Sequence, residues 1–237
     1  MFKQLFKPTT TTTATTTITT TLIKRFMSAS TPIKNSPFKA KVTSIEPLTN
    51  GKWIQTKKIN YDDPNGNSRV WEMAIRTTRS TTTNIDAVSI VSILHNHAND
   101  SKEIVLVKQF RPPTEQVVIE LPAGLIDPNE SIESTAIREL IEETGYYGTF
   151  KSQSIPIFSD PGLTNANMVL AYVDVDLNDP KNQSPQPKLE PGEFIITFTL
   201  PLNNLLHSLE EICEKENCTI DARLYHFAKG LELAQQL

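Results

Sequence analysis

The chain has 237 residues, a net charge of −4 and 38% hydrophobic residues, which is enough for one domain with a substantial core plus appendages. No apolar run approaches the ~18–20 residues that cross a bilayer, so we expect a soluble protein without a membrane span. The two cysteines, Cys213 and Cys218, match neither a zinc-site spacing nor a redox CxxC motif, and we expect them to be reduced in an intracellular protein.

The first 45 residues differ in composition from the rest of the chain. They carry seven basic residues and no acidic one, so the net negative charge comes entirely from Glu46 onward. Residues 9–21 are threonine except for Ala14 and Ile18, a low-complexity run that is not part of the expected fold. The segment has the composition of a mitochondrial transit peptide, but a disordered tail, or a chain that starts at Met27, fits equally well. Both a cytoplasmic and a mitochondrial location therefore stay open.

Residues 46–86 predict a small β-region. Two short runs, Lys52–Tyr61 and Ser68–Thr78, flank a linker rich in turn-forming residues, which favours a β-hairpin. Each arm carries one of the two tryptophans of the chain, Trp53 and Trp71. Packing in a core is the usual role of a tryptophan, so composition alone assigns them no function.

From residue 87 to residue 237 the pattern predicts an α/β (α+β) domain. Its expected strands are apolar, β-branched runs separated by polar or proline-containing loops. They are Ala87–Leu94, Ile104–Phe110, Gln116–Leu121, Ser154–Phe158, Met168–Val175 and Phe194–Leu200. Two helices close the chain, with apolar stripes from Leu202 to Ile212 and from Ile220 to Leu231. The expected architecture is a mixed sheet between helices.

A further helix is predicted in the middle of this domain, and it carries an acidic face. Ser131 suits its N-cap and Gly145 the position after its last turn. Its apolar stripe consists of Ile132, Ala136, Ile137, Leu140 and Ile141. Glu139, Glu142 and Glu143 stand at i, i+3 and i+4, so the three carboxylates share one side of the helix, away from the stripe.

Two interpretations of this acidic face are open. It can simply be solvated, because exposed like-charge neighbours cost only about 0.2–0.5 kcal/mol per pair. In a partly dry cleft, however, carboxylates ~5 Å apart repel by roughly 3 kcal/mol at an effective dielectric of ~20, and the cluster then needs a cation. Oxygen ligands without Cys or His select Mg²⁺, or Mn²⁺ in its place. Arg138 reaches Glu142 at i+4 and can hold that carboxylate in position.

The spacing of the whole stretch carries a resemblance to a known family. Its fixed residues follow the pattern Gly-x5-Glu-x7-Arg-Glu-apolar-x-Glu-Glu-x-Gly, from Gly124 through Glu130 and Arg138 to Gly145, which resembles the Nudix box of the Nudix hydrolases. Tyr146 departs from the aliphatic residue usual at that position. Other runs resemble the ADP-ribose pyrophosphatase branch of the family. They are VKQFRPP at 107–113, ELPAGLID at 120–127, DPGLTN at 160–165, PGEF at 191–194, and the tryptophans in GKW and RVWE.

The resemblance implies a fold and a metal site. The fold would be a Nudix α/β/α sandwich with a mixed sheet, preceded by an N-terminal β-domain that builds a homodimer. Glu139, Glu142 and Glu143 would hold Mg²⁺ together with the main-chain carbonyl of Ala123. Glu193, at the end of a mobile loop, would orient or deprotonate the attacking water. The catalytic residues would thus be Glu142, Glu143, Glu193 and Arg138.

The resemblance also implies ADP-ribose as the substrate, cleaved to AMP and ribose 5-phosphate. The residues expected to bind it are Trp53, Trp71, Glu72, Arg76, Arg111 and Asp160. The tryptophans would sandwich the adenine, with one of them from the other subunit, and the arginines would hold the diphosphate. Glu72 and Asp160 would contact the adenine or the ribose, although surface and turn roles are equally open to them.

Two other functions remain as alternatives. A related pyrophosphatase would act on other nucleoside diphosphate sugars or on oxidised nucleoside diphosphates, because stacking tolerates any base. A non-catalytic ADP-ribose sensor on the same scaffold would have lost the metal carboxylates, and all of them are present here. We expect no nucleic acid and no membrane among the partners.

Overall fold

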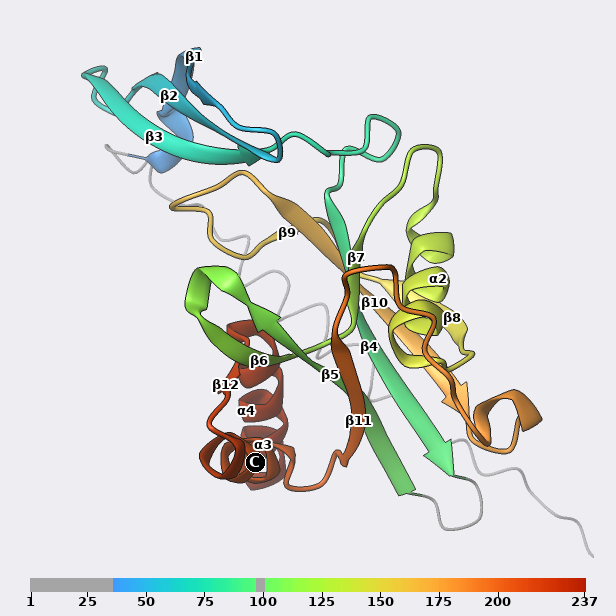
Figure 1. Cartoon of the computed structure of the whole chain (residues 1–237). Helices are drawn as coiled ribbons and strands as arrows, with labels where there is room; N and C mark the ends of the chain where they lie inside the picture. The colour runs from blue at the N-terminus through green and yellow to red at the C-terminus, as the bar shows by residue number, and fades with distance from the viewer. Residues whose placement is uncertain (1–35, 97–100) are drawn as a thin grey trace, which may run out of the picture. The chain divides into compact units, whose positions relative to one another are not determined.

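The computed structural model describes residues 36–96 and 101–237 (Figure 1). Most of the predicted leader lies outside these residues. In the described part, residues 36–45 and 59–71 form one compact unit, and residues 46–58 and 72–237 form another. Every helix in the described ranges is too short or too polar to span a lipid bilayer.

Three strands near the N-terminus form a sheet of their own in the order β1 (Lys41–Asn50), β2 (Ile54–Asp62), β3 (Ser68–Arg76). The predicted hairpin corresponds to β2 and β3. Strand β1 was not predicted, and it begins inside the segment assigned to the leader. Its sequence contains Pro47, which lacks a backbone donor and is tolerated at the edge of a sheet, where β1 lies.

The remaining strands form one mixed sheet of nine strands, in the order β12-β6-β5-β4-β10-β8, with β11 paired to β5, β7 to β4 and β9 to β10. They are β4 (Ala87–Asn96), β5 (Ser101–Arg111), β6 (Gln116–Glu120), β7 (Ala123–Leu125), β8 (Thr149–Gln153), β9 (Ile157–Phe158), β10 (Asn167–Asp176), β11 (Ile195–Pro201) and β12 (Thr219–Ile220). Strand β10 runs parallel to β4, whereas β5 runs antiparallel to it. The expected mixed sheet is confirmed.

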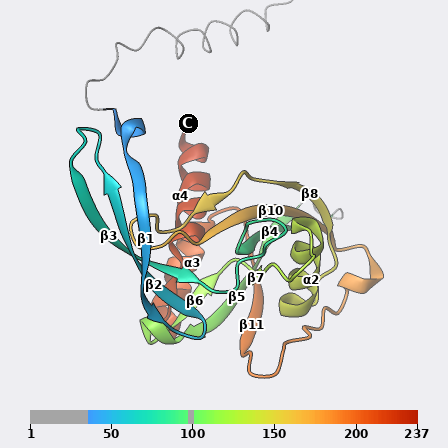
Figure 2. The same ribbon diagram turned by 90° about the horizontal axis from the view of Figure 1, so that it is seen from above.

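Helices cover both faces of this sheet (Figures 1 and 2). Helix α2 (Ile132–Thr144) packs on one face, where its buried Leu140 meets alternate residues of β4 such as Val88 and Ile90. Helices α3 (Leu205–Glu216) and α4 (Ala222–Gln236) pack on the other face, against the intervening residues of β4 and against β5 and β6. The chain therefore forms the predicted α/β/α sandwich, with one apolar core on each side of the sheet.

The sheet opens at one end, and this opening positions the site. Strands β4 and β5 pair only from Ile93 to Asn96 and from Ser101 to Ile104. Beyond this point β4 pairs with the short strand β7, while β5 pairs with β6 and β11. Strand β7 and the end of β5 at Arg111 therefore do not pair with each other, and both line a cleft.

The predicted strand Ser154–Phe158 is confirmed only at Ile157–Phe158, and strands β7, β8 and β12 were not predicted. The run Ser154–Phe158 was expected to be a strand, but the chain pairs with β10 through β8 and then through β9, on either side of Pro156. Proline has no backbone donor and interrupts the ladder there. Strands β7 and β12 have only three and two residues, too few for an alternating pattern to appear in the sequence.

Candidate active site

Helix α2 carries the acidic residues of the site, and capping interactions define where it begins and ends. At the start, the backbone N–H of Ser134 donates to Ser131 Oγ at 3.1 Å, and the N–H of Ser131 donates to Ser134 Oγ at 2.9 Å. This reciprocal cap satisfies two donors that the helix leaves free. At the end, Gly145 adopts a left-handed φ of 76°, and a Cβ there would lie 2.3 Å from the backbone nitrogen of Gln186. The predicted helix limits at Ser131 and Gly145 are confirmed.

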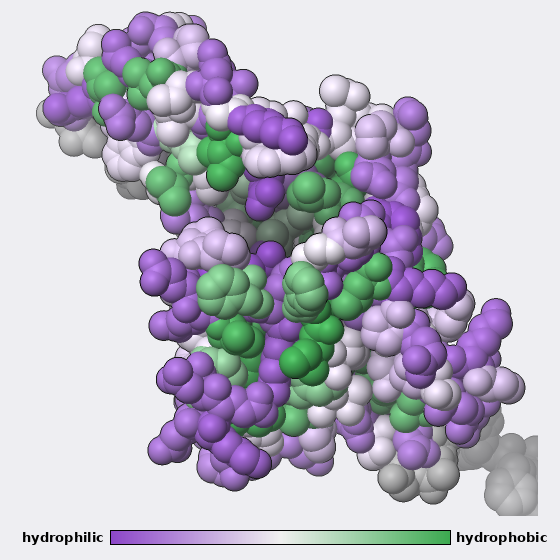
Figure 3. Space-filling view, viewed as in Figure 1, coloured by the Kyte–Doolittle hydropathy of each residue, from purple (hydrophilic) through white to green (hydrophobic). Residues whose placement is uncertain are grey.

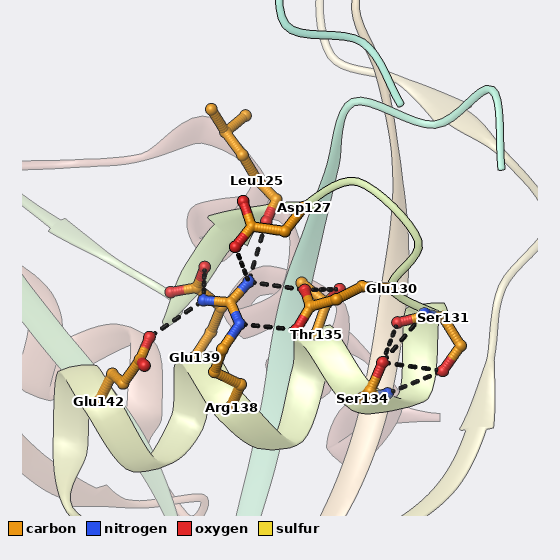
Figure 4. A network of polar contacts seen from close by, with 9 residues as sticks. All are labelled: Leu125, Asp127, Glu130, Ser131, Ser134, Thr135, Arg138, Glu139 and Glu142. Carbon is orange, nitrogen blue, oxygen red and sulfur yellow. Dashed lines mark hydrogen bonds and ion pairs between the residues drawn. The ribbon is translucent and has the colours of Figure 1, made fainter. Parts of the chain in front are cut away.

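Arg138 lies at the centre of a network of carboxylates on this helix (Figure 4). Its Nε and Nη2 each donate to Glu130 at 2.8 Å, and its Nη1 donates to Glu139 at 2.8 Å and to Glu142 at 3.0 Å. Nη2 also reaches the carbonyl oxygen of Leu125 in β7, at 3.2 Å. One guanidinium thus fixes three carboxylates and ties the helix to the neighbouring strand.

The pKa values of the carboxylates in this network shift in opposite directions. The hydrogen bonds from Arg138 lower the pKa of Glu130 to about 2, so Glu130 serves as its permanent anionic partner. Burial raises the pKa of Glu139, although Arg138 opposes the change, and repulsion from Glu142 and Glu193 adds to it. Arg138 therefore holds Glu139 in place but does not fully offset the cost of its negative charge.

Glu143 is the most buried of the three predicted metal ligands, with 7% of its surface exposed. Burial raises the pKa of Glu143 to about 8, against the effect of a hydrogen bond at 3.0 Å from the N–H of Ala123. Glu139 and Glu193 raise it further through repulsion. Burial and mutual repulsion thus both oppose ionisation of Glu139 and Glu143, and a hard cation bound in the cleft would offset both effects.

The glycine that opens the predicted motif is required by a close approach. A Cβ on Gly124 would lie 1.8 Å from a carboxylate oxygen of Glu139. Any other residue would push that carboxylate aside, so the sequence keeps glycine in β7 to let the acidic face of α2 come near the strand.

The acidic residues line a cleft of about 290 Å³. It includes Glu139, Glu142, Glu143, Glu190, Glu193, Asp127, Arg138, Arg111, Gln109 and the three residues of β7. Glu193 reaches it from the loop before β11, where its carboxylate accepts a hydrogen bond from the N–H of Glu190 at 3.0 Å. The four carboxylates predicted as metal ligands or catalytic groups, Glu139, Glu142, Glu143 and Glu193, thus line one cleft, and their donor atoms are all oxygens.

The carboxylates lie in one cleft but are not in the geometry of a metal site. Among residues 36–96 and 101–237, no group of three His, Cys, Asp or Glu side chains already surrounds a common point at ligand distance. Arg138 Nη1 bridges Glu139 and Glu142 instead. We expected Arg138 to hold only one of them. The donor set fits a hard cation, which would draw these two carboxylates away from the arginine.

A larger cleft, of about 860 Å³, adjoins the acidic one and shares β7 and Arg111 with it. Figure 3 shows the surface hollowed beside the β5–β6 hairpin. Arg76, Arg111 and Arg223 line this cleft, so its charge is opposite to that of its neighbour. The guanidinium of Arg111 is held by Glu120, whose Oε2 accepts from Nε and Nη2 at 2.7 Å. The guanidinium of Arg76 makes no hydrogen bond or ion pair to any side chain among residues 36–96 and 101–237.

The other predicted substrate residues lie near the surface. Trp53 is 63% exposed and Trp71 51%, so neither packs in a core. The ammonium of Lys52 lies 4.5 Å from the centre of the Trp53 ring. Glu72 is exposed. The carbonyl of Asp160 caps a turn by accepting from Leu163 and Thr164, and the carbonyl of Leu163 in turn binds Ala74 of β3 at 2.9 Å. The turn role of Asp160 is therefore present, and a substrate role stays a prediction.

Comparison with known proteins identifies the family. The model of the NUDIX domain matches residues 83–217. The chain belongs to the Nudix hydrolase family. Hydrolases of this family generally use a divalent metal ion, in keeping with the acidic cleft.

Relatives with similar names match over most of the chain. The ADP-ribose pyrophosphatase of Saccharomyces cerevisiae is 41% identical over 216 residues, which cover 90% of this Nudix chain and 93% of the yeast protein. The ADP-sugar pyrophosphatase of Mus musculus is 38% identical over 208 residues, covering 88% and 94%. A crystal structure of an ADP compounds hydrolase superposes with a TM-score of 0.55 over 85% of this chain and 97% of that one, at 20% identity. This last similarity supports the Nudix fold alone.

Three charged residues of the larger cleft were not singled out from the sequence. Glu120, Asp221 and Arg223 all line the larger cleft. Glu120 lies in the ELPAGLID run and could have been singled out there. Arg223 and Asp221 belong to the start of α4, where an aspartate N-cap and an arginine in the first turn look like ordinary helix residues.

Proposed function

We propose that the chain hydrolyses the diphosphate of ADP-ribose to AMP and ribose 5-phosphate, with Mg²⁺ as the cation and Mn²⁺ as a substitute. The observation that carries this proposal is the contact between two clefts of opposite charge, which share Arg111 and β7. A diphosphate ester needs both: basic groups for its oxygens, and carboxylates that collect the metal ion. The names of the yeast and mouse relatives support ADP-ribose as the compound.

The acidic cleft would hold the cation through Glu139, Glu142, Glu143 and the carbonyl of Ala123. When bound there, Mg²⁺ supplies charge neutralisation to the diphosphate and makes an attacking water more acidic. Arg138 keeps Glu139 and Glu142 close together through its bonds to both, and a bound cation would take its place between them. A cation there would favour the ionised form of Glu143, whose pKa burial raises.

Glu193 is the proposed general base. It lies in the same cleft as the metal carboxylates and is anchored only by the turn at Glu190, so it can approach the substrate from the loop side. It would orient the attacking water and accept its proton, while the leaving phosphate departs in line.

The basic cleft and the tryptophans would bind the rest of the substrate. Arg76 and Arg111 offer forked donors to the phosphate oxygens. Trp53 and Trp71 are 63% and 51% exposed, and stacking of such a ring on a base is worth ~1–3 kcal/mol. Glu72 and Asp160 are proposed to contact the adenine or the ribose.

We propose also that the chain acts as a homodimer. The sheet formed by β1–β3 exposes apolar side chains that a monomer would leave in water, among them Val42, Ile45, Leu48 and Val70. Sedimentation analysis should show twice the mass of the chain.

Product analysis by chromatography tests the proposed reaction. The full chain is incubated with ADP-ribose and Mg²⁺, with and without EDTA, and the products are separated. AMP that appears only without EDTA supports the reaction and its substrate together. Binding of ADP-ribose without AMP would favour a sensor, and cleavage of other sugar nucleotides in preference to ADP-ribose would favour the related pyrophosphatase.

A further inference from the structure

The basic cleft contains an arginine to which neither the sequence motifs nor the relatives' names give a role. Arg223 lies in the first turn of α4, more than 100 residues from Arg111 in the chain, and lines the same cleft as Arg76 and Arg111. It also lines an adjoining cavity of about 300 Å³ together with Arg76. Its guanidinium therefore lies where two parts of the cleft meet.

Asp221 holds Arg223 in a fixed direction. As N-cap of α4, Asp221 accepts the backbone N–H of Arg223 at 2.9 Å. The same carboxylate accepts Nε on one oxygen and Nη2 on the other, both at 2.7 Å. Burial would raise the pKa of Asp221, but the hydrogen bonds from Arg223 outweigh it and the pKa is lowered. The pair is therefore charged and is aligned by two parallel hydrogen bonds, a geometry that lysine cannot reproduce.

The outer edge of the Arg223 guanidinium is poorly satisfied by the protein. Its Nη1 approaches the sulfur of Met168 at 3.1 Å, and a thioether is a weak acceptor. Its Nη2 lies 4.0 Å from Glu120 Oε1, beyond hydrogen-bond distance, while the other oxygen of Glu120 holds Arg111. A ligand oxygen would be a better partner for Nη1 than the sulfur is.

The balance of charge in the cleft favours an anion. Three guanidinium groups face two carboxylates, Glu120 and Asp221, and each carboxylate is already engaged by an arginine. A diphosphate presents oxygens in several directions and can therefore accept hydrogen bonds from more than one arginine of the cleft.

We propose that Arg223 binds a phosphate oxygen of the nucleoside diphosphate and that Asp221 is its positioning residue. The inference rests on the proposed function and adds a third phosphate-binding arginine to Arg76 and Arg111. Glu120 lies 2.7 Å from Arg111 and 4.0 Å from Arg223.

Binding of ADP in the presence of EDTA tests this assignment without turnover or metal. By titration calorimetry, Arg223→Gln should weaken ADP binding roughly 10- to 100-fold, the effect of losing a charged hydrogen bond, and leave adenosine binding unchanged. Lys229→Gln is the matched control, since it removes the same charge from α4 in an ion pair with Glu232. It should leave ADP binding as in the wild type.

Two conservative variants keep the test decisive if Arg223→Gln folds poorly. Arg223→Lys preserves the charge and should still weaken ADP binding severalfold, because the fork is lost. Asp221→Asn preserves the helix cap and should weaken it as well, because Arg223 loses its ionic anchor. Wild-type affinity for ADP in the Arg223 variants, or an equal loss for adenosine and ADP, would overturn the inference.

The outcomes separate this inference from the proposed function. If the wild-type protein neither binds ADP nor cleaves ADP-ribose, the proposed function fails, and Arg223 loses its assigned ligand with it. If the wild type binds ADP and the Arg223 variants bind it equally well, only the role of Arg223 is overturned.

Discussion

The acidic cleft and the basic cleft are built on the same principle with the signs reversed. In the acidic cleft one guanidinium, that of Arg138, is surrounded by Glu130, Glu139 and Glu142. In the basic cleft one carboxylate, that of Glu120, lies between Arg111 and Arg223. Arg138 binds all three of its carboxylates, whereas Glu120 binds Arg111 at 2.7 Å and only approaches Arg223, which Asp221 holds.

The difference lies in how much charge is left uncompensated. The acidic cleft keeps an excess of carboxylates, with a buried Glu143 whose pKa is raised to about 8, and so it is suited to a cation. The basic cleft keeps an excess of guanidinium groups at its surface and so is suited to an anion. A metal–diphosphate complex would bring a cation to the acidic cleft and an anion to the basic cleft at the same time.

Removing a carboxylate from the acidic cleft should have the largest effect. Glu142→Gln keeps the shape of the side chain but removes a proposed metal ligand, and we expect turnover of ADP-ribose to fall on the order of 10³-fold or more. Steady-state kinetics with saturating Mg²⁺ measures it. Glu133→Gln, in the exposed first turn of the same helix, should be close to wild type. Unchanged turnover in Glu142→Gln would remove the metal assignment.

Removing the counter-ion of the acidic cleft should come next. Arg138→Gln leaves three carboxylates without their shared partner, so we expect a loss of about 3 kcal/mol in the free energy of unfolding and about 10²-fold in kcat. Urea unfolding and kinetics give the two values. Added Mg²⁺ should restore part of the stability, and a variant as stable as the wild type without metal would contradict the network.

Removing the counter-ion of the basic cleft should have a smaller effect. Glu120→Gln is nearly isosteric at a position that is 7% exposed, and it frees Arg111 from its ion pair. We expect KM for ADP-ribose to rise about tenfold and kcat to change far less, because Arg111 would be less well positioned for substrate binding while the metal carboxylates stay intact. A fall in kcat at constant KM would show instead that Glu120 belongs with the metal carboxylates.

The smallest effect concerns Glu130, which supports Arg138 without being a proposed ligand. Its pKa is lowered from 4.5 to about 2, so its stabilising contribution is complete above pH 4.5 and is lost as the pH falls towards 2. Glu130→Gln should therefore cost about 1–3 kcal/mol at neutral pH. The difference from the wild type should shrink in urea titrations between pH 4.5 and 3, and a difference independent of pH would argue against the ion pair.

The acidic cleft could be predicted from the sequence, and so could Arg76 and Arg111 of the basic cleft through the family resemblance, whereas Arg223 and Asp221 could not. Glu139, Glu142 and Glu143 lie within one helical turn, so their spacing alone places them on one face. Gly124 and Arg138 are part of the same local pattern. Arg223 lines the same cleft as Arg111 because β12 pairs with β6, about 100 residues away in the chain, and α4 begins directly after β12. Strand β12 has two residues and no pattern to reveal it.

The central claim is that a cation joins the two clefts through the diphosphate, and one measurement tests it directly. It is the affinity for an ADP-ribose analogue with a methylene group in place of the bridging oxygen, with and without Mg²⁺. We predict that Mg²⁺ strengthens binding to the wild type by roughly tenfold or more and has no such effect on Glu142→Gln. Equal affinities for the wild type with and without Mg²⁺ would contradict the account.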